Sequence, residues 1–278
     1  MDLPPHARAQ VAANVVNFAC VLALVSSFGV RGTAAATVAA QWFAALTNLF
    51  LLVRRGALQR PHLLSPPAWA TAAPLVQAGG LLSVRMFCLL AVVGLATSSA
   101  ARLGTVALAA HEISRQCWLM FAMALESLAI SGQVLVARAL GAGDFGQARG
   151  LARRLFGLSL ASGCALGLAM LAASPHVANL FTGVPAVAAL VATVLPIVAC
   201  MQPVGAIVSV MDGILIGSRD NGFVAASTSL AALVTLGVLY AQQFGGPGGL
   251  VGVWFAMQFL SITRTATHLT RLRMKGLL

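Results

Sequence analysis

Long apolar segments with few charged residues are the feature that most restricts what this chain can fold into. The segment Pro185–Gly217, for example, contains a single charged residue, Asp212. A helix needs about 20 mostly apolar residues to cross roughly 30 Å of hydrocarbon. Over the full 278 residues, 59% are hydrophobic and only 8% are charged, unlike a soluble domain. The sequence therefore predicts an all-α polytopic membrane protein, because only internally hydrogen-bonded backbone is stable in lipid.

Charges and Gly/Pro breaks divide the chain into about eight transmembrane helices. The candidate ranges are 9–28, 33–53, 69–98, 105–140, 146–173, 186–216, 222–242 and 249–270. Residues 54–67 contain three arginines and three prolines, which is typical of a linker. The sequence thus predicts three parts: a helix pair in 1–53, a cytoplasmic linker in 54–67 and a six-helix bundle in 68–278.

The 17 basic residues outnumber the 6 acidic ones. In a soluble chain this excess can indicate a nucleic acid or acidic partner, but here the basic residues are dispersed beside apolar runs. We interpret them as topology charges and expect a lipid bilayer, not nucleic acid, as the partner. With 54–67 in the cytoplasm, 13 basic residues lie inside, two outside and two within spans. This predicts cytoplasmic termini, or stromal ones in a plastid envelope.

Two short motifs have superficial enzymatic matches. GAGDFG (Gly141–Gly146) fits GxGxxG but follows a helix instead of a strand, so we interpret Gly141 as a helix C-cap and Asp144 as an N-cap. HEISR (His111–Arg115) lacks the second histidine of a zinc protease, and no GxSxG occurs. The five cysteines form no CxxC motif. We therefore expect no enzyme activity, no cofactor and no metal site.

The carboxylates are more informative, since a charge at the centre of a membrane helix costs at least ~2.5–3.5 kcal/mol. Glu126 lies near the middle of an apolar helix, and Glu112, Arg115 and Gln133 fall within about 60° of it on a helical wheel. This polar stripe predicts a buried polar face. In the functional interpretation Glu126 carries a proton or cation in a cavity; in the structural alternative it pairs with Arg85 or Arg115.

Asp212 lies in a helix interrupted by Pro203, Gly205 and Gly213. Transporters use such interrupted helices to bind substrate or ions. An equally weighted alternative is that Asp212 is hydrated near the cytoplasmic end of its helix, paired there with Arg219.

Several segments resemble, in order, the second half of multidrug and toxic-compound extrusion (MATE) transporters. They are AAHEISRQCWLMFAMALESLAISGQVLVARALGAGDFGQARGLARRLFGLSLASG, LFTGVPAV, LPIVACMQPVGAIVSVMDGILIGSRD and GLVGVWFAMQFLSITR. GVRGTAAATVAAQW (Gly29–Trp42) is similar to the family's sixth helix. The resemblance runs from about Ala9 to Arg273 and is greatest to the plant and algal branch similar to bacterial DinF-like proteins.

The resemblance implies twelve helices in two six-helix lobes around a central cavity, and antiport of organic compounds against H⁺ or Na⁺. It places Glu126 and Asp212 in the eighth and tenth helices, where several members carry cavity carboxylates. Glu112 stands where glutamine is more common. We expect the coupling and substrate cavity to include the six residues Glu126, Asp212, Gln133, Arg85, Glu112 and Arg115.

The same resemblance places the start of the chain at the fifth helix, so the chain corresponds to the C-terminal two-thirds of a transporter. Residues 1–53 then hold the last two helices of the N-terminal lobe, and 68–278 the complete C-terminal lobe. The missing part includes a first-lobe acidic residue thought to couple protons. The leading hypothesis is a secondary active antiporter, or part of one, that needs a missing N-terminal lobe or second chain. The alternative is a non-transporting membrane subunit or scaffold.

Overall fold

The computed structural model describes residues 5–56, 68–243 and 248–278, and all regular structure in these ranges is helical. This confirms the predicted fold class. The chain divides into two compact units, Met1–Ala73 and Pro74–Leu278. Most of the predicted linker lies outside the described residues.

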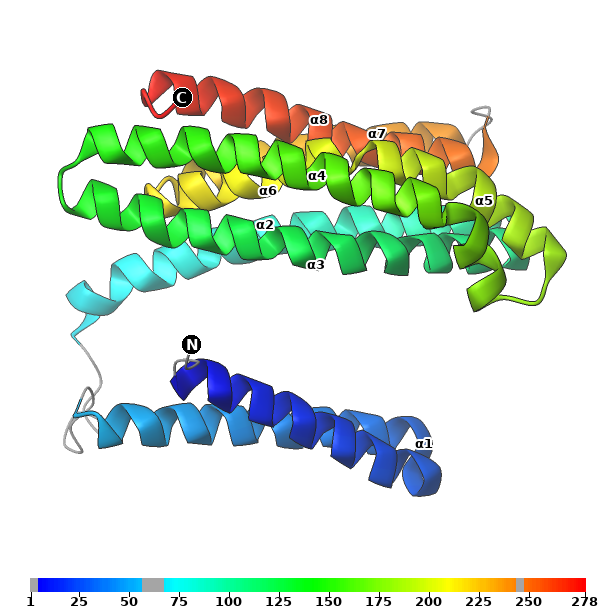
Figure 1. Ribbon diagram of the computed structural model, residues 1–278, viewed down its shortest axis with the longest axis horizontal. Coiled ribbons are helices and arrows are strands. Elements are labelled where there is room, and N and C mark those ends of the chain that lie inside the picture. Colours follow the sequence, from blue (N-terminus) through cyan, green and yellow to red (C-terminus); the bar gives the residue numbers. More distant parts are fainter. Residues whose placement is uncertain (1–4, 57–67, 244–247) are drawn as a thin grey trace. The chain divides into compact units, whose positions relative to one another are not determined.

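The first unit contains α1 (Pro5–Arg54), whose helical backbone is interrupted at Gly29, with φ 54° and ψ −133°. The positive φ at Gly29 lets the chain reverse, so that the two halves of α1 lie side by side (Figure 1). A Cβ on Gly32 would lie 3.1 Å from the Cβ of Leu24, and Ala36 is fully buried. The two predicted helices at 9–28 and 33–53 are therefore these two halves, packed through small residues.

The second unit contains seven helices (Figure 1). They are α2 (Trp69–Arg102), α3 (Thr105–Gly141), α4 (Phe145–Phe181), α5 (Pro185–Cys200), α6 (Gln202–Gly217), α7 (Asn221–Gln243) and α8 (Gly249–Met274). The starts of all of them except α6 lie within one residue of the sequence prediction, because Gly, Pro or charged residues mark these breaks. By length and composition, five helices among the described residues can cross a membrane, or six with α5 and α6 taken as one bent span.

The predicted helix at 186–216 is in fact two helices, α5 and α6, bent by 47°. The break falls at Met201, the residue between Cys200 and Gln202. Pro203 follows at the first turn of α6, where its missing N–H leaves no interior hydrogen bond broken. The Pro/Gly interruption therefore has the predicted effect, but it occurs about 15 Å along the helix from Asp212.

Two local predictions need correction. The predicted helix at 146–173 continues to Phe181 because Pro175 is accommodated inside α4. The hydroxyl of Ser174 donates to the Leu171 carbonyl at 2.8 Å, which is the carbonyl that Pro175 leaves without its usual donor. At the other turn, the left-handed residue is Gly143 (φ 76°), not Gly141, which ends α3. The N-cap at Asp144 is confirmed, since its Oδ1 accepts the Gln147 N–H at 2.7 Å.

Glycines allow the backbone of α6 to pack directly against α3 and α4. A Cβ on Gly213 would overlap the carbonyl oxygen of Ala129 on α3, and one on Gly217 would lie 2.5 Å from the Gln133 carbonyl oxygen. On α4, a Cβ on Gly163 would lie 2.7 Å from the Cα of Pro203. Small residues let membrane helices approach this closely and gain van der Waals contact. These contacts hold α6, and with it Asp212, in a fixed place.

Candidate functional site

A cavity of about 230 Å³ lies inside the second unit, lined by residues of α2, α3, α6 and α8. Its polar lining consists of Arg85, Trp118, Glu126, Gln202, Ser209, Asp212, Trp254, Gln258, Ser261 and Arg264. The rest of the lining is mostly apolar. A largely apolar cavity with a few convergent polar groups is the usual form of a small-molecule site.

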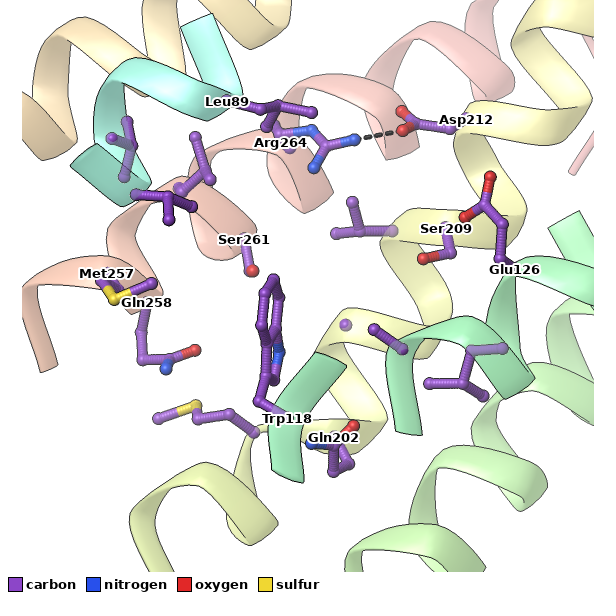
Figure 2. Close-up of a pocket in the computed structure, with 18 of the residues that line it drawn as sticks. Leu89, Trp118, Glu126, Gln202, Ser209, Asp212, Met257, Gln258, Ser261 and Arg264 are labelled. Carbon is purple, nitrogen blue, oxygen red and sulfur yellow. Dashed lines mark hydrogen bonds and ion pairs between the residues drawn. The ribbon is translucent and has the colours of Figure 1, made fainter. Parts of the chain in front are cut away.

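Asp212 is the centre of a buried ion-pair cluster. Its Oδ2 accepts the Nη2 groups of both Arg85 on α2 and Arg264 on α8. The carboxylate is 4% exposed, and Arg264 is buried with it (Figure 2). On the other side of the carboxylate, Oδ1 lies 3.3 Å from Nδ1 of His268. The pairing of Asp212 with Arg219, considered from the sequence, is not formed.

Glu126 reaches the same cavity from α3, and Figure 2 shows its carboxylate directed toward the part of the cavity that contains Asp212 and Ser209. Its residue is exposed, and no hydrogen bond or ion pair joins it to the described residues. Neither Arg85 nor Arg115 is its partner, so the structural alternative weighed for Glu126 is not realised. The cavity thus holds one carboxylate neutralised by two arginines and one that is open.

The polar stripe predicted on α3 is divided among three surroundings. Glu112 and Arg115 pair with each other, with Arg115 Nη2 2.6 Å from Glu112 Oε2, and neither lines the cavity that contains Glu126. Gln133 lines a separate open pocket with Arg138 and Arg219. These side chains share one face of α3 but do not share one site. The helix is 37 residues long, and different helices pack against it along its length.

The break between α5 and α6 contributes to the cavity through Gln202, which is 2% exposed. Its Nε2 lies 3.5 Å from the Val198 carbonyl, and Gln258 on α8 donates to the Trp254 carbonyl at 3.3 Å. The Gln202 amide is thus oriented by the last turn of α5, and the Gln258 amide by its own helix α8. Together with the indole of Trp118, which lies near both amides in Figure 2, they form the neutral part of the cavity.

A second cluster lies at the end of the unit where α3, α6 and α8 end. Asp220 Oδ2 is 2.7 Å from Arg271 Nε and 3.2 Å from Lys275 Nζ, and the Arg271 guanidinium stacks 5.1 Å from the Phe223 ring centroid. Burial acts to raise the pKa of Asp220, but the hydrogen bonds from Arg271 and Lys275 outweigh it and hold that pKa below its ordinary value. This end also carries most of the unit's arginines, and we call it the basic end. Its basic residues are Arg138, Arg149, Arg153, Arg154, Arg219, Arg271, Arg273 and Lys275.

Sequence reasoning identified Glu126, Asp212 and Arg85 as cavity residues but missed Arg264 and His268, which contact Asp212 from α8. Arg264 was treated as a topology charge. A signal was present, because polar residues recur along α8 at intervals of three or four positions, which places them on one helix face. They are Gln258, Ser261, Arg264 and His268.

A family model described as MatE matches residues 83–241, more than half of the chain. Protein DETOXIFICATION 44, chloroplastic, of Arabidopsis thaliana is 31% identical over 266 residues, which cover 95% of this chain and 50% of that protein. Multidrug and toxin extrusion protein 1 of Xenopus tropicalis is 32% identical over 168 residues, 59% of this chain and 29% of that protein. The chain spans about half the length of DETOXIFICATION 44 and of DETOXIFICATION 43, which it also resembles.

The fold is also similar to solved structures of MATE transporters. A crystal structure of MATE in the bent conformation superposes with a TM-score of 0.80 at 16% identity, covering 97% of this chain and 61% of that one. The Vibrio cholerae MATE transporter VcmN in the bent form gives a TM-score of 0.76 at 19% identity, with 97% and 63% coverage. At these identities the structures show a shared fold, and together with the sequence matches they establish that the chain belongs to the MATE family of integral membrane transporters.

Proposed function

We propose that this chain supplies the cavity-bearing second lobe of a secondary active exporter, which moves organic compounds out in exchange for H⁺ or Na⁺ by alternating access. The observation that carries the proposal is the cavity itself. Two carboxylates and two guanidiniums converge on it inside a bundle of apolar helices, where ionisable groups are costly unless they serve a function.

The two carboxylates take different roles in this proposal. Glu126 is the exchangeable one, because it faces the cavity without an ion pair to any described residue and is therefore free to bind H⁺ or Na⁺. Asp212 is already ion-paired with both Arg85 and Arg264. Asp212 thereby sets the charge of the cavity and links α2, α6 and α8.

An organic solute would use the remaining lining. The indole of Trp118 offers an aromatic face, and the amides of Gln202 and Gln258 offer polar contacts beside it. Glu112, Arg115 and Gln133 lie outside this cavity, so we assign them no contact with a solute there.

The membrane orientation follows from charge. The basic end carries the arginines of the α3–α4 and α6–α7 turns, and the positive-inside rule assigns it to the cytoplasm. In a plastid envelope the equivalent side is the stroma. Both termini lie on that side in this proposal.

The alternative proposal is that this polypeptide acts as a non-transporting subunit or scaffold that associates with another transporter chain. The two proposals differ in whether this polypeptide moves solute.

Proteoliposomes separate these proposals. We expect the purified protein to release ethidium or a radiolabelled organic acid when a pH or Na⁺ gradient is imposed, and Glu126→Gln to abolish that release. Glu112→Gln is the matched control, since it changes the same residue type on the same helix outside the cavity. Release that is equally fast in Glu126→Gln removes the coupling role. The subunit proposal is supported instead if the wild type releases no solute but changes the transport rate of a full-length relative reconstituted with it.

A further inference from the structure

The two oxygens of Asp212 have very different surroundings. Oδ2 takes both arginine contacts, whereas Oδ1 is buried and has no hydrogen bond to any described residue. Nδ1 of His268 lies 3.3 Å from Oδ1, and this nitrogen is also buried without a hydrogen bond. A hydrogen bond between these two buried atoms would satisfy both.

The other ring nitrogen of His268 is held from α7. Its Nε2 lies 2.9 Å from Oγ of Ser227, and that Oγ lies 3.2 Å from the carbonyl oxygen of Val224. The hydroxyl has one proton, so it donates either to His268 Nε2 or to Val224. Ser227 is therefore able to pair with either neutral tautomer of the ring.

These contacts allow two complete hydrogen-bond patterns. When Asp212 is ionised, His268 Nδ1–H donates to Oδ1 and Nε2 accepts from the Ser227 hydroxyl. When Asp212 is protonated, Oδ1–H donates to Nδ1, Nε2–H donates to Ser227 Oγ, and the hydroxyl donates to Val224. In both patterns, Asp212 Oδ1, the two ring nitrogens of His268 and the Ser227 hydroxyl all have hydrogen-bond partners.

Burial, together with Arg264 and Arg85, favours a neutral His268 ring, whereas ionised Asp212 acts in the opposite direction. Asp212 faces it from α6, Arg264 from its own helix α8, and Arg85 from α2; α7 contributes only the hydroxyl of Ser227 and the Phe223 ring, 6.0 Å away between centroids. An imidazolium would be a third cation beside one carboxylate. The ring is fully buried, so such a charge would not be hydrated.

We infer that His268, oriented by Ser227, is a positioning residue that hydrogen-bonds to Asp212 in both protonation states and exchanges its tautomer as the proton leaves. The Oδ1 proton moves to Nδ1, the Nε2 proton moves to Ser227 Oγ, and the hydroxyl's own proton passes to a water molecule. One proton leaves, Asp212 becomes an anion, and His268 stays neutral. The inference rests on the proposed function in assigning this exchange to transport.

The consequence for the cavity concerns the arginines. Protonated Asp212 is no longer a counter-ion, so Arg85 and Arg264 become two cations available to the cavity. When Asp212 is ionised, it pairs with both arginines again. The His268–Ser227 pair thus lets the charge of the cavity change without leaving a buried hydrogen-bonding group unpaired.

The test is a ¹⁵N NMR titration of histidine-labelled protein in lipid bilayers, because protonated and unprotonated ring nitrogens give separate resonances. The His268 signals are assigned by their loss in His268→Gln and independently by their shift in Ser227→Ala. We expect a neutral ring at every pH, mainly Nδ1–H at high pH and mainly Nε2–H at low pH. Asp212→Asn is expected to show a single tautomer throughout.

A wild-type ring that keeps one tautomer at all pH values, or becomes an imidazolium, overturns the inference. The wild-type titration and Ser227→Ala decide this even if Asp212→Asn does not fold. The readout is independent of transport. A tautomer change in protein that does not transport refutes the proposed antiport alone, whereas intact antiport with a fixed tautomer refutes this inference alone.

Discussion

Gly213 on α6 contacts Ala129 on α3 through the backbone, with no room between them for a methyl group. Replacing Gly213 by alanine forces the helices apart, because the atom it meets is a carbonyl oxygen and not the end of a flexible side chain. We expect Gly213→Ala to lower the free energy of unfolding by about 1–3 kcal/mol, the range for overpacking a tight interface. Unfolding with a denaturing detergent in mixed micelles measures it.

The matched control is Gly237→Ala on α7, where a Cβ would have no neighbour within 4 Å. That change is expected to be neutral or to stabilise by up to about 1 kcal/mol, since alanine favours the helix. Equal destabilisation by the two substitutions would contradict the close contact at Gly213.

Asp212→Asn is expected to be among the most destabilising polar substitutions in the chain. It leaves Arg85 and Arg264 without their common counter-ion, and removing one partner of a buried ion pair costs about 3–5 kcal/mol. The double variant Asp212→Asn with Arg264→Met should recover part of this loss, because it also removes a buried charge. The same detergent unfolding measures both. A loss below about 1 kcal/mol, as for an exposed pair, would show that the cluster is hydrated.

Asp220 gives a pH-dependent prediction. Its pKa is lower in the folded protein than the ordinary value of 3.8, so its contribution to stability is complete above that pH and is lost as the pH falls through the folded pKa. Asp220→Asn should therefore lower the thermal midpoint at pH 7, and the two proteins should converge below about pH 3.8. High salt should also reduce the difference at pH 7, because the partners Arg271 and Lys275 are partly exposed.

The N-cap at Asp144 is testable locally. Asp144→Ala removes the acceptor of the Gln147 N–H and is expected to cost about 1 kcal/mol, with faster hydrogen exchange at that amide. Asp144→Asn keeps an acceptor oxygen and serves as the control. Unchanged exchange in the alanine variant would show that another group caps α4.

The helices were predictable from the sequence because span length and Gly/Pro breaks act locally. Even the interruption near Pro203 was visible, although not that it separates two helices bent by 47°. The extension of α4 through Pro175 was not visible, because it depends on Ser174 replacing a single backbone donor. Local composition therefore determined where helices start better than where they end.

The candidate site was only partly predictable. A carboxylate in an apolar helix is conspicuous, so Glu126 and Asp212 were identified individually. Their partners come from other helices, and a single sequence does not state which arginine meets which carboxylate. Arg264 illustrates this, because its position near the end of α8 is equally consistent with a topology charge and with the ion pair that it forms.

The backbone contacts of Gly213 and Gly217 with α3 also constrain how the cavity can change shape. Glu126 and Asp212 belong to the two helices joined by these contacts, so these helices could separate only by breaking the close backbone contacts between them. In the proposed export cycle, α2 and α8, and with them Arg85 and Arg264, would therefore move relative to this pair of helices. The backbone separation of Glu126 and Asp212 would then be almost constant, and the distance that varies would be the one between their carboxylates and the guanidiniums.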